Sequence, residues 1–440
     1  MSSSTFIDYL SSPSGSLCGS INIPGDKSIS HRAVIMGSIA IGITQIKGLL
    51  KSADIVSTVN VFRDMGVCIE ESSDEMIIHG VGLHGLKEPA NALDFGNSGT
   101  SVRILGGLLS TQKFDATLIG DDSLSQRPMR RIIDPLIEMG ATLNCSTQHT
   151  LPIHIKGSNS LNGIAYHLPV ASAQLKSCLL LAGLYAKGKT RIIEDSVTRD
   201  HTERMLIEFG ANIDVKKEYI EIQSGELSAR KIQIPGDISS AAFFLVAASI
   251  CPGSNLVLKN VGINPTRDAV IEILRRMGAN IEVKMINDTG IESIADIHVQ
   301  YSSLVGIKIP EELVPIAIDE LPVIMIAAAF AKGDTELVNA TELRVKESDR
   351  IEAIAVGLKS LGIQVITRDD GMMVTGGKLN GGEVHSYGDH RIAMAFAIAA
   401  SNAGETIKIL DCVNVNTSFP DFIEISSSIG LNIRTQERNG

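Results

Sequence analysis

The chain has 440 residues, which is long for one hydrophobic core and predicts two large globular parts. Apolar residues make up 44% of the chain and charged residues 20%, a composition that is typical of folded proteins and excludes a disordered one. The formal net charge of −11 excludes general attraction to nucleic acid or to an anionic membrane. An anionic ligand would therefore have to be bound by local basic groups.

The cysteines and the amino-terminal segment further narrow the class of protein. No CxxC or Cys/His pairing joins the six cysteines, which are Cys18, Cys68, Cys145, Cys178, Cys251 and Cys412, so neither a zinc site nor a disulfide framework is predicted. Residues 1–20 lack the basic start and apolar run of a signal peptide. The longest apolar stretches, 241–250 and 323–331, are much shorter than the roughly 20 residues of a membrane span. We expect a cytoplasmic protein without metal, membrane or nucleic-acid partners.

One short pattern recurs six times along the chain: an amphipathic stretch, a bulky apolar residue, a glycine and a β-type run. The segments read RDMGVCIE, IEMGATLN, IEFGANID, RRMGANIE, KSLGIQVI and SSIGLNIR, with glycines Gly66, Gly140, Gly210, Gly278, Gly362 and Gly430. A glycine just past a helix and before alternating apolar residues is typical of a helix end that leads into a strand. The pattern predicts six repeats of about 70 residues.

A second kind of helix, apolar on nearly all sides, is predicted once in each repeat. These helices begin near Ser30, Gly99, Ser172, Ser239, Asp319 and Asp389. A helix without a polar face is buried inside its layer. Each repeat therefore combines one buried and one amphipathic helix, separated by strands.

The tetrapeptide IPGD occurs at Ile23–Asp26 and again at Ile234–Asp237, three repeats further on. This predicts two related globules of three repeats: residues 25–235 form one, and residues 1–24 with 236–440 form the other. No low-complexity linker separates them, so the connections are short. We expect the ligand site in the cleft between the two globules.

The first turns of the apolar helices collect polar residues that a buried helix does not need for packing. The segments are 26–32 (DKSISHR), 97–101 (NSGTS), 172–174 (SAQ), 319–320 (DE) and 389–391 (DHR). Helix amino termini expose unpaired N–H groups and partial positive charge, so several of them around one cleft would attract phosphate or carboxylate. Ordinary N-capping explains Ser239, but not Lys27 with Arg32, or His390 with Arg391.

Basic residues also open the predicted amphipathic helices, at Arg127, Arg199 and Lys346. Lys346 and Arg350 are expected one turn apart on the same helical face. Arginine offers a bidentate fork to carboxylate or phosphate, whereas lysine is a point charge. Surface charge is the simpler alternative for each residue alone, but the agreement with the repeats favours a binding role.

Two formal motif matches are rejected because their elements come in the wrong order. Residues 183–190 fit the phosphate-loop pattern, but they end a predicted helix and open a strand. Residues 80–85 fit a dinucleotide fingerprint, but no helix is predicted to follow them. A phosphate-loop nucleotide hydrolase is therefore rejected, and no cofactor is expected.

Eight segments together resemble one known family. They are GDKSISHR, GNSGTSVR, DDSLSQRPM, SAQLKSCLLLAGL, TRDHTERML, IDELPVIMIAAAFAKGDT, LRVKESDRI and GDHRIAMA, in this order. Between Ile23 and Phe422 the chain resembles the 5-enolpyruvylshikimate-3-phosphate synthases. The resemblance implies an α/β (α+β) fold of two globules. This fold is an inside-out α/β barrel of six βαβαββ repeats, three per globule, with buried helices and the sheets outside.

The same resemblance implies a reaction. The enolpyruvyl group of phosphoenolpyruvate would be transferred to the 5-hydroxyl of shikimate-3-phosphate by addition and elimination, with release of phosphate. The product leads to chorismate and the aromatic amino acids. The resemblance also implies that the enzyme is a target of glyphosate, and Gly99, the smaller of the residues that the family has there, leaves room for that inhibitor.

The resemblance further implies the substrate-binding residues. Shikimate-3-phosphate would be bound by Lys27, Ser28, Arg32, Ser172, Ala173, Gln174, Arg199, Asp319 and Lys346. Phosphoenolpyruvate would be bound by Lys27, Asn97, Gly99, Thr100, Arg127, Gln174, Arg350, His390 and Arg391. Some relatives have a second serine where this chain has Ala173, so a contact there must come from its backbone. Thr417 stands where some relatives have a lysine, so this chain lacks that charge.

The reaction explains the residue types. The acceptor hydroxyl loses a proton while the methylene of phosphoenolpyruvate gains one, which requires a base and an acid in different environments. We assign Asp319 as the base, and Lys27 and Glu347 as the groups that handle the methylene and leaving-phosphate protons. Sequence does not divide these last two roles.

Two other functions remain as alternatives. The related transferase that acts on UDP-N-acetylglucosamine has a cysteine on the loop before the position of Arg127, whereas residues 120–129 contain none. A non-catalytic protein that binds phosphorylated metabolites would not need Asp319 and Glu347 beside its phosphate-binding groups. The two-globule arrangement favours a monomer whose partners are its two small-molecule substrates.

Overall fold

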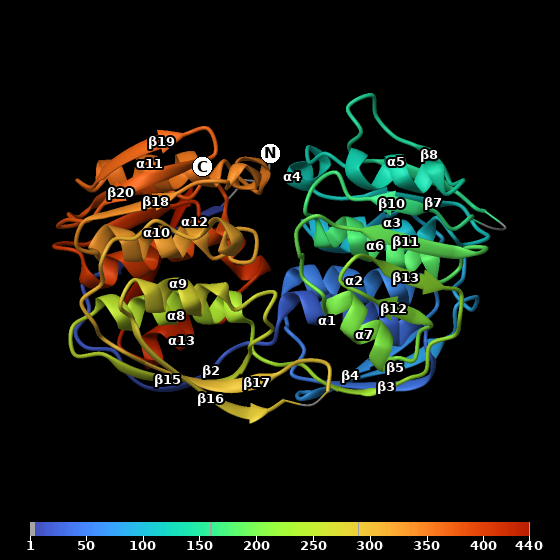
Figure 1. Cartoon of the computed structure of the whole chain (residues 1–440), viewed down its shortest axis with the longest axis horizontal. Helices are drawn as coiled ribbons and strands as arrows, with labels where there is room; N and C mark the ends of the chain where they lie inside the picture. The colour runs from blue at the N-terminus through green and yellow to red at the C-terminus, as the bar shows by residue number, and fades with distance from the viewer. Residues whose placement is uncertain (1–4, 159–160, 289, 440) are drawn as a thin grey trace. The chain divides into compact units, whose positions relative to one another are not determined.

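The computed structural model describes residues 5–158, 161–288 and 290–439. The chain divides into two compact units. We call Gly25–Ile234 the central unit, and Met1–Pro24 with Pro235–Gly440 the terminal unit. Within the described residues each unit contains three β-sheets and the helices that pack against them (Figure 1).

The central unit has sheets of strand order β14-β3-β5-β4, β6-β7-β9-β8 and β10-β11-β13-β12. The strands are β3 (Ile41–Lys47), β4 (Cys68–Glu71), β5 (Glu75–Val81), β6 (Leu93–Asp94), β7 (Ala116–Ile119), β8 (Thr142–Asn144), β9 (Ile153–Lys156), β10 (Ala165–His167), β11 (Lys189–Ile193), β12 (Ile213–Val215), β13 (Ile220–Gln223) and β14 (Lys231–Gln233). The helices are α1 (Lys27–Ile39), α2 (Ala53–Asp64), α3 (Gly99–Leu109), α4 (Asp122–Ser125), α5 (Arg130–Glu138), α6 (Ala173–Gly183) and α7 (His201–Glu208).

The terminal unit has sheets of strand order β2-β15-β17-β16, β18-β20-β19 and β21-β22-β1-β23. The strands are β1 (Thr5–Ser12), β2 (Cys18–Asn22), β15 (Asn255–Gly262), β16 (Asn280–Asn287), β17 (Ile294–Gln300), β18 (Asp334–Leu337), β19 (Gln364–Arg368), β20 (Gly371–Thr375), β21 (Gly382–His385), β22 (Ile407–Leu410) and β23 (Asn432–Asn439). The α-helices are α8 (Ile238–Ile250), α9 (Ala269–Arg276), α10 (Leu321–Phe330), α11 (Arg350–Ser360), α12 (His390–Ala399) and α13 (Phe422–Ser428). Short 3₁₀ helices are η1 (Glu311–Leu313), η2 (Thr341–Val345), η3 (Ala400–Asn402) and η4 (Val413–Thr417).

The six sheets repeat one topology, which confirms the predicted βαβαββ repeat. In the sheet of β10 to β13, β10 pairs in parallel with β11, and the hairpin of β12 and β13 completes the sheet in antiparallel fashion. The other four-stranded sheets have the same order. The sheet of β18 to β20 lacks a regular first strand, where isolated parallel bridges join Val305 to Lys332 and Lys308 to Glu336. The strand β1 fills the last place in the sheet of β21 to β23.

The six repeat glycines end their helices as predicted. All of them have positive φ angles, at Gly66, Gly140, Gly210, Gly278, Gly362 and Gly430. Residues with a Cβ rarely adopt this conformation, which reverses the chain after a helix and directs it into the next strand. The turn chemistry of the sequence therefore explains where these six helices end.

The apolar helices are buried in their units, also as predicted. In α8 every residue except Ser240 is buried, and in α10 every residue except Phe330. Strands of the terminal unit lie outside helix α8, which contacts β15 and β17 (Figure 1). No helix of the described residues has both the length and the apolar character that a bilayer span needs.

One local prediction is wrong. Lys346 and Arg350 do not share a helical face, because α11 begins at Arg350 and Lys346 follows the 3₁₀ helix η2. Asp349 caps α11 by accepting a hydrogen bond from the Glu352 amide at 3.0 Å. This N-cap stops the helix from extending back to Lys346.

Close packing of α3 against α6 provides a test of the core of the central unit. A Cβ atom at Gly107 would lie 2.0 Å from the Cys178 carbonyl oxygen, so we expect Gly107→Ala to destabilise the protein by about 1–3 kcal/mol. The matched control is Gly106→Ala in the same helix, whose Cβ would meet only the tip of Ile132 at 3.0 Å. That variant should gain up to about 1 kcal/mol of helix propensity. Thermal and urea unfolding of both variants would measure the difference, and equal midpoints would contradict the packing argument.

Candidate active site

In the central unit, three buried helices begin with capped first turns. The side chains of Asp26, Ser98 and Ser172 accept hydrogen bonds from backbone amides in the first turns of α1, α3 and α6. Lys27, Gly99 and Ala173 follow directly as the first residues of these helices. The capping residues thus satisfy backbone amides in the first turns of these helices.

Hydrogen bonds join the starts of α3 and α6. Gln174 donates to Thr100 Oγ1 at 3.1 Å and accepts from Arg103 at 3.0 Å. Arg127, which lies between α4 and α5, donates to the Asn97 side chain at 2.7 Å. The structure therefore brings together predicted residues that are 77 positions apart, from Asn97 to Gln174.

Arg103 is a residue that the sequence analysis missed. It lies one turn after Gly99 on α3, and its guanidinium contacts the Gln174 side chain. A Cβ at Gly99 would be 2.9 Å from Arg103 Nη1 and 3.3 Å from Arg127 Nη1. Because Gly99 has no side chain, both guanidinium groups can lie close to its backbone. An arginine inside the apolar run TSVRILGG was the available signal.

Arg32 of α1 is buried and makes polar contacts with two other helices. It donates to Thr202 Oγ1 at 2.6 Å, to Ser177 Oγ at 2.7 Å and to the Ser28 carbonyl at 2.9 Å. Ser177 belongs to α6 and Thr202 to α7. Arg32 therefore ties α1 to both helices.

Lys27 and His31 lie one turn apart on α1. Lys27 forms an ion pair with Asp54 of α2. The buried His31 ring is hydrogen-bonded through Nδ1 to Thr58 Oγ1 at 2.8 Å, and Thr58 to Ser101 at 2.8 Å. Burial, followed by the charges of Lys27 and Arg32, holds the pKa of His31 well below its usual value.

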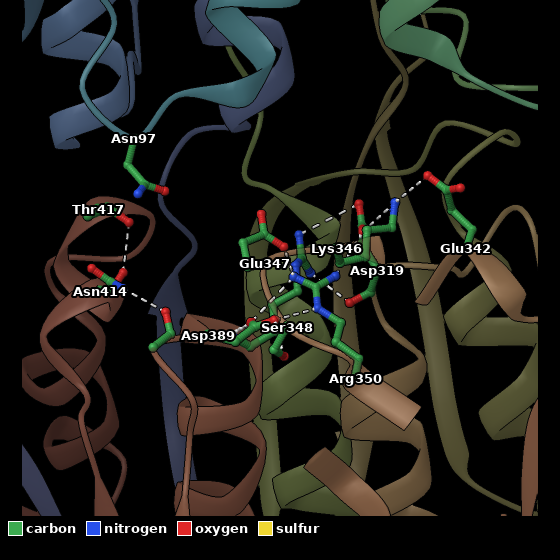
Figure 2. A network of polar contacts seen from close by, with 12 residues as sticks. Asn97, Asp319, Glu342, Lys346, Glu347, Ser348, Arg350, Asp389, Asn414 and Thr417 are labelled. Atoms are coloured by element: carbon green, nitrogen blue, oxygen red, sulfur yellow. Dashed lines mark hydrogen bonds and ion pairs between the residues drawn. The ribbon is translucent and has the colours of Figure 1, made fainter. Parts of the chain in front are cut away.

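In the terminal unit, the Arg350 guanidinium is the centre of a carboxylate cluster (Figure 2). It is 1% exposed and contacts Asp389 at 2.8 Å, Asp319 at 3.3 Å and Glu347 at 2.5 Å. Burial alone would lower the pKa of Arg350, but the three carboxylates more than offset it and raise the pKa above its ordinary value. Arg350 therefore remains charged.

Asp319 lies just before α10, among three cationic side chains. Besides Arg350, Lys346 lies 3.8 Å from its Oδ1 and Arg391 lies 3.9 Å from its Oδ2. Arg391 also donates to the Asp319 carbonyl at 2.8 Å, and Lys346 lies 3.7 Å from Glu342 (Figure 2). The structure thus brings the predicted base together with three predicted binding residues of its unit.

The other predicted residues are placed by the elements that carry them. His390 is buried at the start of α12, directly after Asp389. Thr417 ends η4 and donates to the Asn414 carbonyl at 2.8 Å (Figure 2). Arg127 and Arg199 precede their helices rather than opening them, since α5 begins at Arg130 and α7 at His201.

Cys68, Glu70 and His79 form a group of potential metal ligands that cysteine spacing did not reveal. Cys68 and His79 are cross-strand partners on β4 and β5, so only strand pairing brings them together. Glu70 already pairs with His79 at 2.8 Å. These residues lie outside the clusters described above and are not used in the reaction below.

Comparisons with known proteins point to one family. A family model described as EPSP synthase (3-phosphoshikimate 1-carboxyvinyltransferase) matches residues 12–425. The chain is 55% identical over 427 residues to the 3-phosphoshikimate 1-carboxyvinyltransferase of Methylococcus capsulatus, covering 97% of this chain and 98% of that protein. The chain is 54% identical over 428 residues to the protein of the same description from Nitrosococcus oceani, covering 97% of this chain and 96% of that protein.

Solved structures agree with this result. The EPSP synthase of Acinetobacter baumannii has a TM-score of 0.88 and 49% identity, and the match covers 98% of this chain and 100% of that one. The enolpyruvyl transferase NikO of Streptomyces tendae shares the fold, with a TM-score of 0.77, 16% identity and coverage of 99% and 100%.

The buried pair of Arg350 and Asp389 provides a test of the terminal-unit cluster. Asp389→Asn removes the buried carboxylate charge that pairs with the Arg350 guanidinium. We expect a loss of about 2–3 kcal/mol in the free energy of unfolding. The control Asp349→Asn changes a partly exposed N-cap at the start of α11 and should cost about 0–1 kcal/mol, because asparagine also caps helices. Denaturant unfolding would compare the two, and an equal loss would argue against a special role for the buried pair.

The buried His31 ring predicts a pH dependence of stability. Its pKa is lowered in the folded protein, so below pH of about 6.5 the unfolded chain gains a proton that the folded one does not. The free energy of unfolding should therefore fall with acidity, by up to about 1.4 kcal/mol per pH unit. His31→Asn should reduce this slope, whereas His154→Asn at an exposed position should not. An unchanged slope in His31→Asn, measured by thermal unfolding between about pH 5.5 and 7.5, one unit either side of the unfolded pKa, would refute the assignment.

Proposed function

The chain belongs to the EPSP synthase family, and from this premise we propose that the central-unit and terminal-unit clusters are the two halves of one active site. The reaction is the transfer of the enolpyruvyl group of phosphoenolpyruvate to the 5-hydroxyl of shikimate-3-phosphate, with release of phosphate. This step belongs to the shikimate pathway of aromatic amino acid biosynthesis. One observation carries the proposal: in both units, cationic side chains gather where the buried helices begin.

We propose that shikimate-3-phosphate binds to the half-site of the central unit. Its phosphate and carboxylate would be bound by Lys27, Ser28, Arg32, Ser172 and Arg199, with Gln174 and the Ala173 backbone beside them. Asp319 and Lys346 would complete the site from the terminal unit. The tight contacts of Arg32 with Ser177 and Thr202 support this assignment, because they hold the guanidinium in place before the substrate binds.

Phosphoenolpyruvate would be bound by arginines from both units. Arg127, Gln174, Gly99, Thr100 and Asn97 would contribute from the central unit, together with Lys27. Arg350, His390 and Arg391 would contribute from the terminal unit. Because arginine binds carboxylate and phosphate bidentately, the two anionic groups of this substrate would draw the units together and exclude water.

The proton transfers follow from this arrangement. Asp319 accepts the proton of the 5-hydroxyl, whose oxygen attacks the carbon of phosphoenolpyruvate that bears the phosphate ester. The methylene receives a proton from Lys27 or Glu347, and a tetrahedral adduct forms. Loss of a methyl proton and of phosphate then yields the enolpyruvyl ether. The ion pair between Glu347 and Arg350, at 2.5 Å, supports the proton-transfer role of Glu347 only by placing it beside a side chain that we assign to phosphoenolpyruvate.

The state of the protein in the cell is a further part of the proposal. We infer a cytoplasmic monomer that needs no partner other than its two substrates. The two half-sites of a single chain support this inference, because the proposed site is complete without a second copy. Gel filtration with light scattering would test the monomer.

The assignment of Asp319 as the base predicts the behaviour of one variant. Asp319→Asn keeps the shape of the side chain but cannot accept the proton, so kcat should fall by about 10²–10⁴-fold while both substrates still bind. Phosphate release measures turnover, and calorimetric titration measures binding.

The matched control is Glu342→Gln, which neutralises a neighbouring carboxylate near Lys346. Its kcat should stay close to that of the unaltered protein. Near-normal turnover by Asp319→Asn would remove the base assignment. Activity with UDP-N-acetylglucosamine in place of shikimate-3-phosphate would contradict the proposed acceptor.

A further inference from the structure

The central unit contains a buried lysine that takes no part in the proposed chemistry. Lys176 of α6 is 1% exposed, and its ammonium lies 2.6 Å from Glu203 of α7 and 3.1 Å from Glu194. It also donates to the Thr198 carbonyl at 3.4 Å. An ammonium has three N–H donors, and these three oxygens match them.

Two of these partners belong to the segment that carries Arg199. Residues 194–200 connect β11 to α7 and contain no regular secondary structure. Thr198 Oγ1 donates to Glu194 Oε2 at 2.8 Å. Lys176, Glu194 and Thr198 therefore each contact the other two. Arg199 follows directly after the Thr198 carbonyl.

The other end of the segment is anchored by the same helix. Glu203 lies in the first turn of α7, and its buried carboxylate forms an ion pair with the ammonium of Lys176. Burial raises the pKa of Glu203, and the charge of Lys176 opposes that rise. The adjacent Thr202 is hydrogen-bonded to Ser177, the residue after Lys176, at 2.6 Å. Consecutive residues of α6 thus fix consecutive residues of α7.

We propose that Lys176 is a positioning residue for shikimate-3-phosphate binding, and that it acts by holding Arg199 in place through the segment 194–200. A segment without regular structure would leave an arginine many conformations, and ordering it during binding would weaken affinity. The buried ammonium orders the backbone next to Arg199 in advance. This inference rests on the proposed role of Arg199.

The consequence is a selective defect. Lys176→Met keeps the apolar stem but removes the ammonium, so the segment loses its anchor. KM for shikimate-3-phosphate should rise by about 10-fold, while KM for phosphoenolpyruvate and kcat change by less than about 3-fold. Lys176→Arg, which keeps a buried cation, should recover part of the affinity.

The control removes another lysine–glutamate pair from the same unit. Lys189 lies at the start of β11, is 56% exposed, and pairs with Glu221, which Arg191 also contacts. Lys189→Met should leave both KM values unchanged. Where Lys176→Met does not fold, Glu194→Gln tests the same anchor at its more exposed end, with the same selective rise in KM expected.

A double variant separates this inference from the proposal on which it rests. If Lys176 acts through Arg199, then Lys176→Met in an Arg199→Met background should raise KM no further. An effect of Arg199→Met without one from Lys176→Met or Glu194→Gln overturns only the positioning role. No effect of Arg199→Met on KM overturns the role of Arg199 in binding. Equal rises in both KM values with a lowered thermal midpoint would show a merely structural lysine and overturn the inference.

Discussion

A helix that is buried on all sides accommodates a charged group along its length only where polar partners compensate it, and this constraint organises each unit of the protein. In α8 and α10 nearly every side chain is packed in the core, so no position along their length is free for a charged group. Polar side chains therefore gather in the first turns and in the segments just before them. Asp319 and Arg391 lie at such positions, where helix amino termini also favour bound anions.

The second constraint is the desolvation of charge. Arg350 and Lys176 are as buried as the apolar core, and each is surrounded by carboxylates that compensate its charge. Arg32 instead meets hydroxyl and carbonyl oxygens. In each case the polar contacts that compensate the buried charge also fix the orientation of the side chain. A site built on such groups needs little rearrangement to bind an anion.

Local sequence signals predicted much of this architecture. The glycines that end the amphipathic helices and the apolar runs of the buried helices depend on neighbouring residues only, and both are confirmed. The prediction for Lys346 was wrong for a local reason as well, because spacing alone does not show that Asp349 caps the helix after it. Arg103 was missed because its partner, Gln174, is 71 positions away.

Sequence by itself thus determined the six repeats and the family, and it suggested the residue types of the proposed site, because backbone periodicity, turn preference and motif order are properties of short segments. Only the tertiary structure decided which charges meet. The three carboxylates around Arg350 come from three separate segments, and Lys176 meets Glu194 and Glu203 through the packing of α6 against its neighbours. Glu347 is a local neighbour of Arg350, but Asp319 and Asp389 reach it from 31 and 39 positions away, and such contacts depend on the packing of segments far apart in the chain, which no local pattern encodes.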